Sequence, residues 1–162
     1  MRKFLFFILV SLNLSWGTQI EGVPFVKQKD EYCGPASLSS VLMFYGYHIS
    51  QEEIAKEVYI PKLKGVLVTD LENFSKKLGF NTVLKSSTIE DIKKFLDERK
   101  PIIALIDMGF WILSKPHYIV VLGYNDKGFI VHTGYEPKKL IDYREFEERW
   151  KKLGSIVLVV YR

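Results

Sequence analysis

Residues 28–36 read Gln-Lys-Asp-Glu-Tyr-Cys-Gly-Pro-Ala and run directly into an apolar-periodic segment. Cys33 is the only cysteine in the chain. Because Leu38, Val41 and Leu42 follow at helical spacing, the sequence predicts a helix from Cys33 to about residue 45. Unpaired backbone N–H groups and the helix dipole stabilise negative charge at a helix start. The thiol is therefore predicted to have a pKa below the value of about 8.5 of free cysteine, as a nucleophile requires.

A histidine far downstream is the natural partner of this thiol. His117 opens the run His-Tyr-Ile-Val-Val-Leu-Gly-Tyr over residues 117–124, which is typical of a buried strand. A cysteine that opens a helix and a histidine that opens a strand indicate a candidate cysteine hydrolase.

Size and composition limit the other possibilities. The chain has 162 residues, which suits one ordinary domain, and its 48% hydrophobic and 14% aromatic content excludes disorder. The formal net charge is +4, and no dense stripe of lysine and arginine interleaved with aromatic residues occurs. We therefore expect no nucleic-acid partner.

The first residues have the features of an export signal. Arg2 and Lys3 precede an apolar stretch over residues 4–10, and small residues near Gly17 fit a cleavage site. The sequence thus predicts a signal peptide over residues 1–17, a single domain over residues 18–162, and export to a periplasmic or extracellular location. The alternative is an N-terminal membrane anchor, or transient membrane association through this segment. With one cysteine, the chain forms no internal disulfide.

Capping patterns predict further helices along the first part of the chain. The pairs are Ser50 with Glu53, Thr69 with Glu72, Ser87 with Glu90, and, near the C-terminus, Asp142 with Glu145. Strands are predicted over residues 102–106, 117–124, 129–133 and 155–161, with the second and third forming a hairpin. This order predicts an α+β fold, with N-terminal helices packed on a mainly antiparallel C-terminal sheet.

The apolar segment over residues 108–113, Met-Gly-Phe-Trp-Ile-Leu, lies between a predicted strand and His117. One interpretation is that it folds back into the core. The other is that Phe110 and Trp111 form a wall of the substrate cleft, because ligand clefts are mostly apolar.

These motifs resemble one known family. Gln28 five residues before Cys33-Gly34-Pro35-Ala36, together with the run that begins at His117, is similar to the bacteriocin-processing peptidases, papain-like cysteine peptidases that remove double-glycine leader peptides. The resemblance is closest to stand-alone, exported members. It implies the papain-like cysteine peptidase fold, Cys33 as nucleophile, His117 as general base and acid, and Gln28 as a donor to the oxyanion.

One position departs from the family pattern. Leader peptidases have an aspartate, usually followed by proline, after the strand next to the histidine strand, whereas this chain has Thr133. Thr133 is the expected partner of the imidazole, and Asp107 and Glu136 are the possible substitutes. Strand alternation places His132 on the opposite face from Thr133, which predicts a structural role. His48 is expected to be solvated in a loop.

Two other functions remain open at this point. The chain is either a cysteine peptidase acting on a peptide or protein, a catalytically impaired peptide-binding or assembly module on the same fold, or a Cys–His amidase. No cofactor is implied, since the chain has no glycine-rich phosphate loop. Three histidines and one cysteine at these spacings predict no metal site. The sequence makes no prediction of oligomeric state.

Overall fold

The computed structural model describes residues 17–162 and has an α+β fold. Of the predicted signal peptide, all but Gly17 lies outside the described residues. The helices are α1 (Cys33–Phe44), α2 (Gln51–Val58), α3 (Val68–Lys77), α4 (Ile89–Asp97) and α5 (Tyr143–Lys151), with a short 3-10 helix η1 (Pro61–Leu63). The strands are β1 (Thr18–Gln19), β2 (Asn81–Ser86), β3 (Ile102–Asp107), β4 (Pro116–Tyr124), β5 (Gly128–His132), β6 (Lys139–Asp142) and β7 (Ile156–Tyr161).

The strands form one antiparallel sheet in the order β2-β7-β3-β4-β5-β6. The register pairs Ile106 of β3 with His117 of β4, and Val120 of β4 with His132 of β5. Because the chain continues past His132 alongside β4, it passes back toward His117. β1 pairs with the far end of β4, beyond the point where β3 begins.

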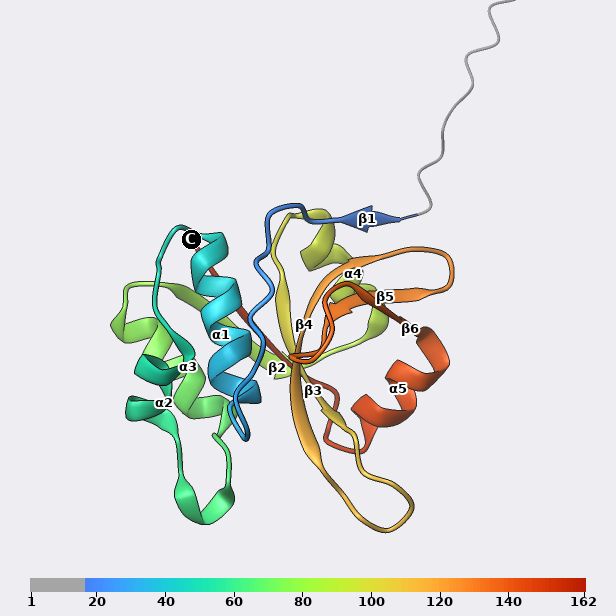
Figure 1. Cartoon of the computed structure of the whole chain (residues 1–162). Coiled ribbons are helices and arrows are strands. Elements are labelled where there is room, and N and C mark those ends of the chain that lie inside the picture. Colours follow the sequence, from blue (N-terminus) through green and yellow to red (C-terminus); the bar gives the residue numbers. More distant parts are fainter. Residues whose placement is uncertain (1–16) are drawn as a thin grey trace, which may run out of the picture.

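Helices cover both faces of this sheet. In Figure 1, α1, α2 and α3 lie on one side of the strands and α5 lies on the other. The central strands β3, β4 and β7 are buried almost throughout, because both faces are covered. The arrangement confirms the predicted fold class, N-terminal helices on an antiparallel sheet.

Helix α1 runs through the middle of the helical layer. Residues 34–42 are all buried, including three serines. The helix is therefore covered on all sides in this stretch, and not only along one apolar face. Ser39 and Ser40 donate hydrogen bonds to the carbonyl oxygens of Ile49 and Pro24. Polar groups inside the helical layer are thereby satisfied, and the middle of α1 is tied to the segments that contain Pro24 and Ile49.

The four predicted strands are confirmed within one or two residues, but three others, β1, β2 and β6, were not predicted, and β1 has only two residues. β2 is half-exposed and β6 has four residues, so neither has the long apolar run that identifies a buried strand. Residues 23–26, whose sequence Val-Pro-Phe-Val is compatible with either a strand or a merely docked segment, are not part of a strand. Among residues 17–162, no helix has the length and apolar character needed to cross a membrane.

Two predicted caps are corrected by the structure. The Ser50–Glu53 box and the Asp142 cap are present as predicted. The cap of α4 is Thr88 with Asp91, one residue later than predicted. Helix α3 begins before Thr69, which is therefore inside the helix, and Glu72 instead accepts a hydrogen bond from the Thr82 hydroxyl.

Candidate active site

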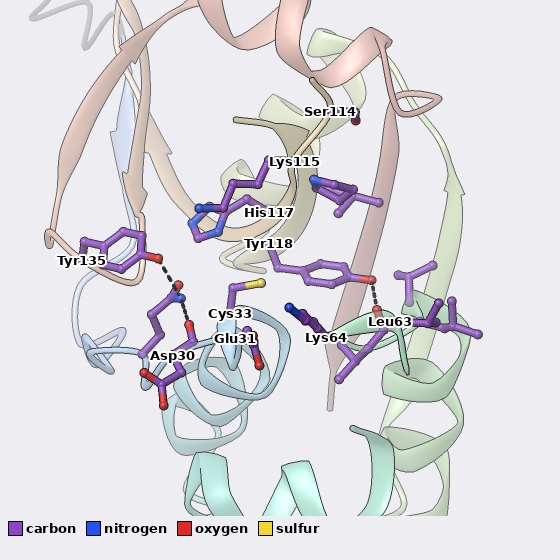
Figure 2. Close-up of a pocket in the computed structure, with 17 residues that line it drawn as sticks. Asp30, Glu31, Cys33, Leu63, Lys64, Ser114, Lys115, His117, Tyr118 and Tyr135 are labelled. Carbon is purple, nitrogen blue, oxygen red and sulfur yellow. Dashed lines mark hydrogen bonds between the residues drawn. The ribbon is translucent and has the colours of Figure 1, made fainter. Parts of the chain in front are cut away.

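A cleft of about 690 Å³ lies where the start of α1 meets β4. It falls in the size range of small-ligand sites. Its walls come from the segment before α1, the chain between η1 and α3, and the adjoining ends of β3 and β4. Figure 2 shows Cys33, His117 and Tyr135 around this space. The sequence-predicted Cys33, His117 and Gln28 all line it.

Cys33 is the first residue of α1, whose N-cap residue, Tyr32, provides no side-chain cap. Burial raises the pKa of the Cys33 thiol, while the backbone N–H groups of Tyr118, Gly34 and Cys33 and the charge of Lys115 act in the opposite direction. The predicted lowering of this pKa is therefore wrong for the free protein, because burial disfavours the thiolate more than the helix start favours it. The thiol is protonated at neutral pH.

The glycine after Cys33 is required by packing. A Cβ atom on Gly34 would lie 2.3 Å from Cγ2 of Val66 and 3.3 Å from the ring of Tyr118. The Tyr118 hydroxyl donates a hydrogen bond of 3.0 Å to the Val66 carbonyl oxygen, which closes this side of the cleft. Gly34 thus lets the first turn of α1 approach β4, bringing Cys33 to the strand that begins near His117.

The imidazole of His117 is buried and held by one hydrogen bond. Its Nε2 lies 2.6 Å from the backbone carbonyl oxygen of Thr133. Because a carbonyl only accepts, Nε2 carries the hydrogen and Nδ1 presents a lone pair that is able to take a proton. Burial lowers the pKa of His117, partly opposed by the Thr133 carbonyl. In the free protein the cysteine and the histidine are therefore both neutral.

The partner of His117 differs from the expected one. The Thr133 hydroxyl does not contact the imidazole; it accepts hydrogen bonds from the backbone N–H groups of Tyr135 and Glu136. Asp107 is also excluded as the partner, since its carboxylate accepts from the N–H groups of Gly109 and Lys115.

The second possible substitute, Glu136, is also engaged elsewhere. Its carboxylate pairs with Lys139 at 3.5 Å. A backbone carbonyl therefore stands where the family pattern has a carboxylate. It orients the imidazole but brings no negative charge.

Gln28 is a buried residue whose amide faces the loop after β5. Nε2 donates to the Asp30 carbonyl oxygen at 2.8 Å and to the Tyr135 hydroxyl at 3.1 Å. Oε1 has no hydrogen-bond partner among the described residues. A Cβ on Gly134, which has φ +89°, would lie 2.4 Å from Oε1, so the glycine makes room for this side chain. Gln28 is thus at the cleft, with both amide hydrogens engaged.

Tyr135 is a residue of the site that sequence reasoning missed. Its ring is stacked on that of His117, with centroids 5.7 Å apart and planes 5° apart, and its hydroxyl accepts from Gln28. The only sequence signal is its place two residues after Thr133, because an exposed tyrosine in a loop carries no pattern of its own.

The other two histidines lie outside the cleft. His132 is buried; its Nδ1 accepts from the Lys138 N–H, so its Nε2 donates to the Val23 carbonyl oxygen at 2.9 Å. It joins the lead-in segment to β5, consistent with the predicted structural role. His48 is exposed. Within residues 17–162, no three His, Cys, Asp or Glu side chains gather in a way that would hold a metal ion.

Comparison with known protein families finds one that matches most of the chain. The Peptidase_C39 like family matches residues 20–157. This chain belongs to the Peptidase_C39 like family. No curated protein matches the sequence of this C39-like chain.

Solved structures share the fold of the C39-like chain. A Bacillus anthracis protein described as a C39-like peptidase aligns with a TM-score of 0.75 at 16% identity, over 90% of this chain and 98% of that one. The peptidase domain of Streptococcus ComA, a bifunctional ABC transporter, gives 0.72 at 23% identity, over 86% and 98%. A double-glycine motif protease from an AMS/PCAT transporter, solved with its leader peptide, gives 0.71 at 20% identity, over 88% and 92%. At such identities the likeness concerns the fold.

Proposed function

We propose that the protein is a cysteine peptidase that cleaves a peptide bond with Cys33 as nucleophile and His117 as general base. The observation that carries the proposal is the cleft shared by the partly buried Cys33 thiol and an imidazole whose Nε2 is fixed by a carbonyl oxygen. That bond leaves Nδ1 as the proton acceptor. Membership of the Peptidase_C39 like family supports the same reaction class.

In the first step, the thiol proton passes to Nδ1 of His117 as the sulfur attacks the carbonyl carbon of the substrate. The negative charge moves to the carbonyl oxygen, and the backbone N–H of Cys33 and Nε2 of Gln28 are the proposed donors to it. Since that Gln28 amide hydrogen is bonded to Tyr135, the substrate oxygen takes the place of the Tyr135 hydroxyl.

In the second step, the C–N bond breaks and the imidazolium gives its proton to the leaving amine. A thioester remains on Cys33. Water, deprotonated by His117, then attacks the thioester carbon and releases the acid and the thiol.

The substrate is proposed to be an extended peptide or a protein segment with small residues at the cleavage point. A double-glycine motif protease of the same fold has been solved with its leader peptide bound. We also propose that the chain is exported, from its predicted signal peptide, so the substrate would be met outside the cytoplasm. N-terminal sequencing of the protein from its native cell checks the cleavage after residue 17.

A second candidate, a peptide-binding module without activity, is favoured by one specific observation. His117 has a carbonyl oxygen as its partner, where a carboxylate would stabilise the imidazolium. Binding requires neither a thiolate nor an imidazolium, and both groups are neutral in the free protein.

The test is to incubate the protein with a double-glycine leader peptide and with a mixed peptide library, and to detect new termini by mass spectrometry. Cys33→Ser and His117→Gln are the matched variants, because each conserves the approximate size of the side chain. We expect wild-type products that both variants lack. Peptide binding to all three proteins without any product supports the binding module instead. Products of equal yield from Cys33→Ser would contradict the cysteine mechanism.

A further inference from the structure

The loop between β3 and β4 displays a group of large apolar side chains to solvent. Phe110 is 86% exposed, Trp111 87%, Ile112 81% and Leu113 73%. Exposed apolar residues are usually scattered singly, whereas these four are consecutive. The interpretation of this segment as core is therefore wrong, and so is that of Phe110 and Trp111 as a cleft wall, because the cleft is lined by residues 114–118 instead.

The backbone of the loop holds these side chains outward. The Asp107 carboxylate accepts from the N–H groups of Gly109 and Lys115, and the Met108 N–H donates to the Lys115 carbonyl oxygen. Trp111 has φ +59°, a left-handed conformation that turns the chain back at the tip. The loop is thus closed by its own hydrogen bonds, and its apolar tip does not pack on the domain.

A second loop on the rim of the cleft, between α2 and α3, also exposes an apolar side chain. Leu63, 58% exposed, lies between Lys62 and Lys64. Leu63 and Lys64 line the cleft from one side, and Lys115 lines it from the other. Figure 1 shows the two loops projecting at the same end of the molecule, the end at which α1 begins. Apolar tips flanked by lysines therefore border the entrance to the site.

Cations also lie at the base of the first loop. Lys152 is close enough to Asp107 to interact with its carboxylate, and Arg149 donates to the Asp107 carbonyl oxygen at 2.9 Å. The acidic residues on the rim, Asp30 and Glu31, belong to the segment before α1, and Glu31 accepts a hydrogen bond from Tyr59. Arg149 is also paired with Glu145 at 3.2 Å, whereas among residues 17–162 Lys62, Lys64 and Lys115 form no salt bridge with a carboxylate.

We infer that residues 108–113, with Leu63, insert into the surface of an anionic lipid bilayer and place the cleft entrance against it. Side chains exposed by more than 80% on a projecting tip offer surface on all sides. A groove on another protein would contact only part of such a tip, because its shape is fixed. The fluid apolar interior of a bilayer can surround the tip on every side. Tryptophan and phenylalanine suit the boundary between headgroups and acyl chains, and lysines suit anionic headgroups. This inference is independent of the proposed peptidase activity.

The test measures the fluorescence of Trp111 in the full chain carrying Trp16→Phe. Trp150 is 2% exposed and gives a constant background. The protein is mixed with phosphatidylcholine vesicles, with or without phosphatidylglycerol, that contain brominated acyl chains. Phe110→Ser/Ile112→Ser/Leu113→Ser keeps the reporter and loses the apolar tip. Leu140→Ser, at a position 44% exposed on β6, is the matched control.

We expect a blue shift and quenching of Trp111 on the anionic vesicles in the parent and in Leu140→Ser. The triple variant, folded as judged by circular dichroism, should lose on the order of tenfold or more in vesicle partitioning of the tip. Unquenched Trp111 in the parent overturns the inference, as does equal quenching in the triple variant. Equal quenching on neutral vesicles overturns the role of the lysines. A Trp111 already shifted in vesicle-free protein that self-associates identifies a second copy as the occupant and also overturns it.

Discussion

At the scale of single residues, the site combines two groups that are neutral at rest. Burial raises the pKa of the Cys33 thiol and lowers that of the His117 imidazole. A helix start favours the thiolate, but the desolvation of a buried sulfur outweighs this effect here. The thiol therefore gives up its proton to His117 only as substrate arrives, when the carbonyl carbon takes the electron pair of the sulfur.

This neutrality predicts how Cys33 reacts with iodoacetamide as the pH rises. We expect the rate to have its midpoint above the value of about 8.5 of free cysteine. His117→Gln should change the midpoint little, because a neutral imidazole offers the thiolate no charge. A midpoint well below that of free cysteine, rising on His117→Gln, would instead show an ion pair in the free protein.

The backbone carbonyl of Thr133 accepts a hydrogen bond from His117, whereas its hydroxyl accepts hydrogen bonds within the turn after β5. Thr133→Ala removes the acceptor of two backbone N–H groups and should lower the free energy of unfolding by about 1 kcal/mol, with Thr133→Ser close to wild type. Urea denaturation measures both variants. If Thr133→Ala were as stable as Thr133→Ser, the hydroxyl would not hold the turn.

At the scale of elements, the close approach of α1 to β4 depends on Gly34. Gly34→Ala puts a Cβ atom 2.3 Å from Cγ2 of Val66 and should destabilise the fold by about 1–3 kcal/mol. Gly65→Ala, whose Cβ would meet only the Leu63 carbonyl oxygen at 3.8 Å, is the matched control and should be tolerated.

A double-mutant cycle assigns the effect of Gly34→Ala to this contact. Val66→Ala removes the clashing methyl group, so Gly34→Ala/Val66→Ala should recover part of the loss, measured by thermal unfolding. If the effects of the two substitutions on stability were strictly additive, the destabilisation by Gly34→Ala would not come from its contact with Val66.

Sequence patterns predicted the elements with strong periodicity and missed those without it. The buried strands β3, β4 and β7 and the helix after Cys33 follow from long apolar runs. Edge strand β2 depends on pairing with the distant β7, and β6, which pairs with the neighbouring β5, is too short to show an apolar run of its own. The same holds at the site: the motif predicted Cys33, His117 and Gln28, which line one cleft, but the stacking of Tyr135 on His117 arises from the path of the chain after β5.

At the scale of the whole molecule, burial of histidine links stability to pH. His132 and His117 are both buried and both have lowered pKa values. In the unfolded chain histidine titrates near about 6.5. Below that pH the two histidines bind protons in the unfolded state more readily than in the folded state. Their contribution to the stability of the folded state is therefore present above about pH 6.5. It is lost as the pH falls toward the pKa values of the folded state.

We therefore expect the urea midpoint to fall between about pH 7.5 and pH 5.5. His132→Gln should have a shallower pH dependence, because one of the two titrating groups is gone, even if its stability at neutral pH is lower. A midpoint that does not change with pH in the wild type would contradict the lowered pKa values.

The protonated state of Cys33 also bears on how long the protein survives outside a reducing environment. Peroxide oxidises thiolates rather than thiols, so a sulfur kept protonated by burial forms sulfenic acid slowly. The chain has no second cysteine that would turn such an oxidised sulfur into an internal disulfide. The burial that delays activation of the nucleophile until a substrate is bound thus also protects it chemically between encounters.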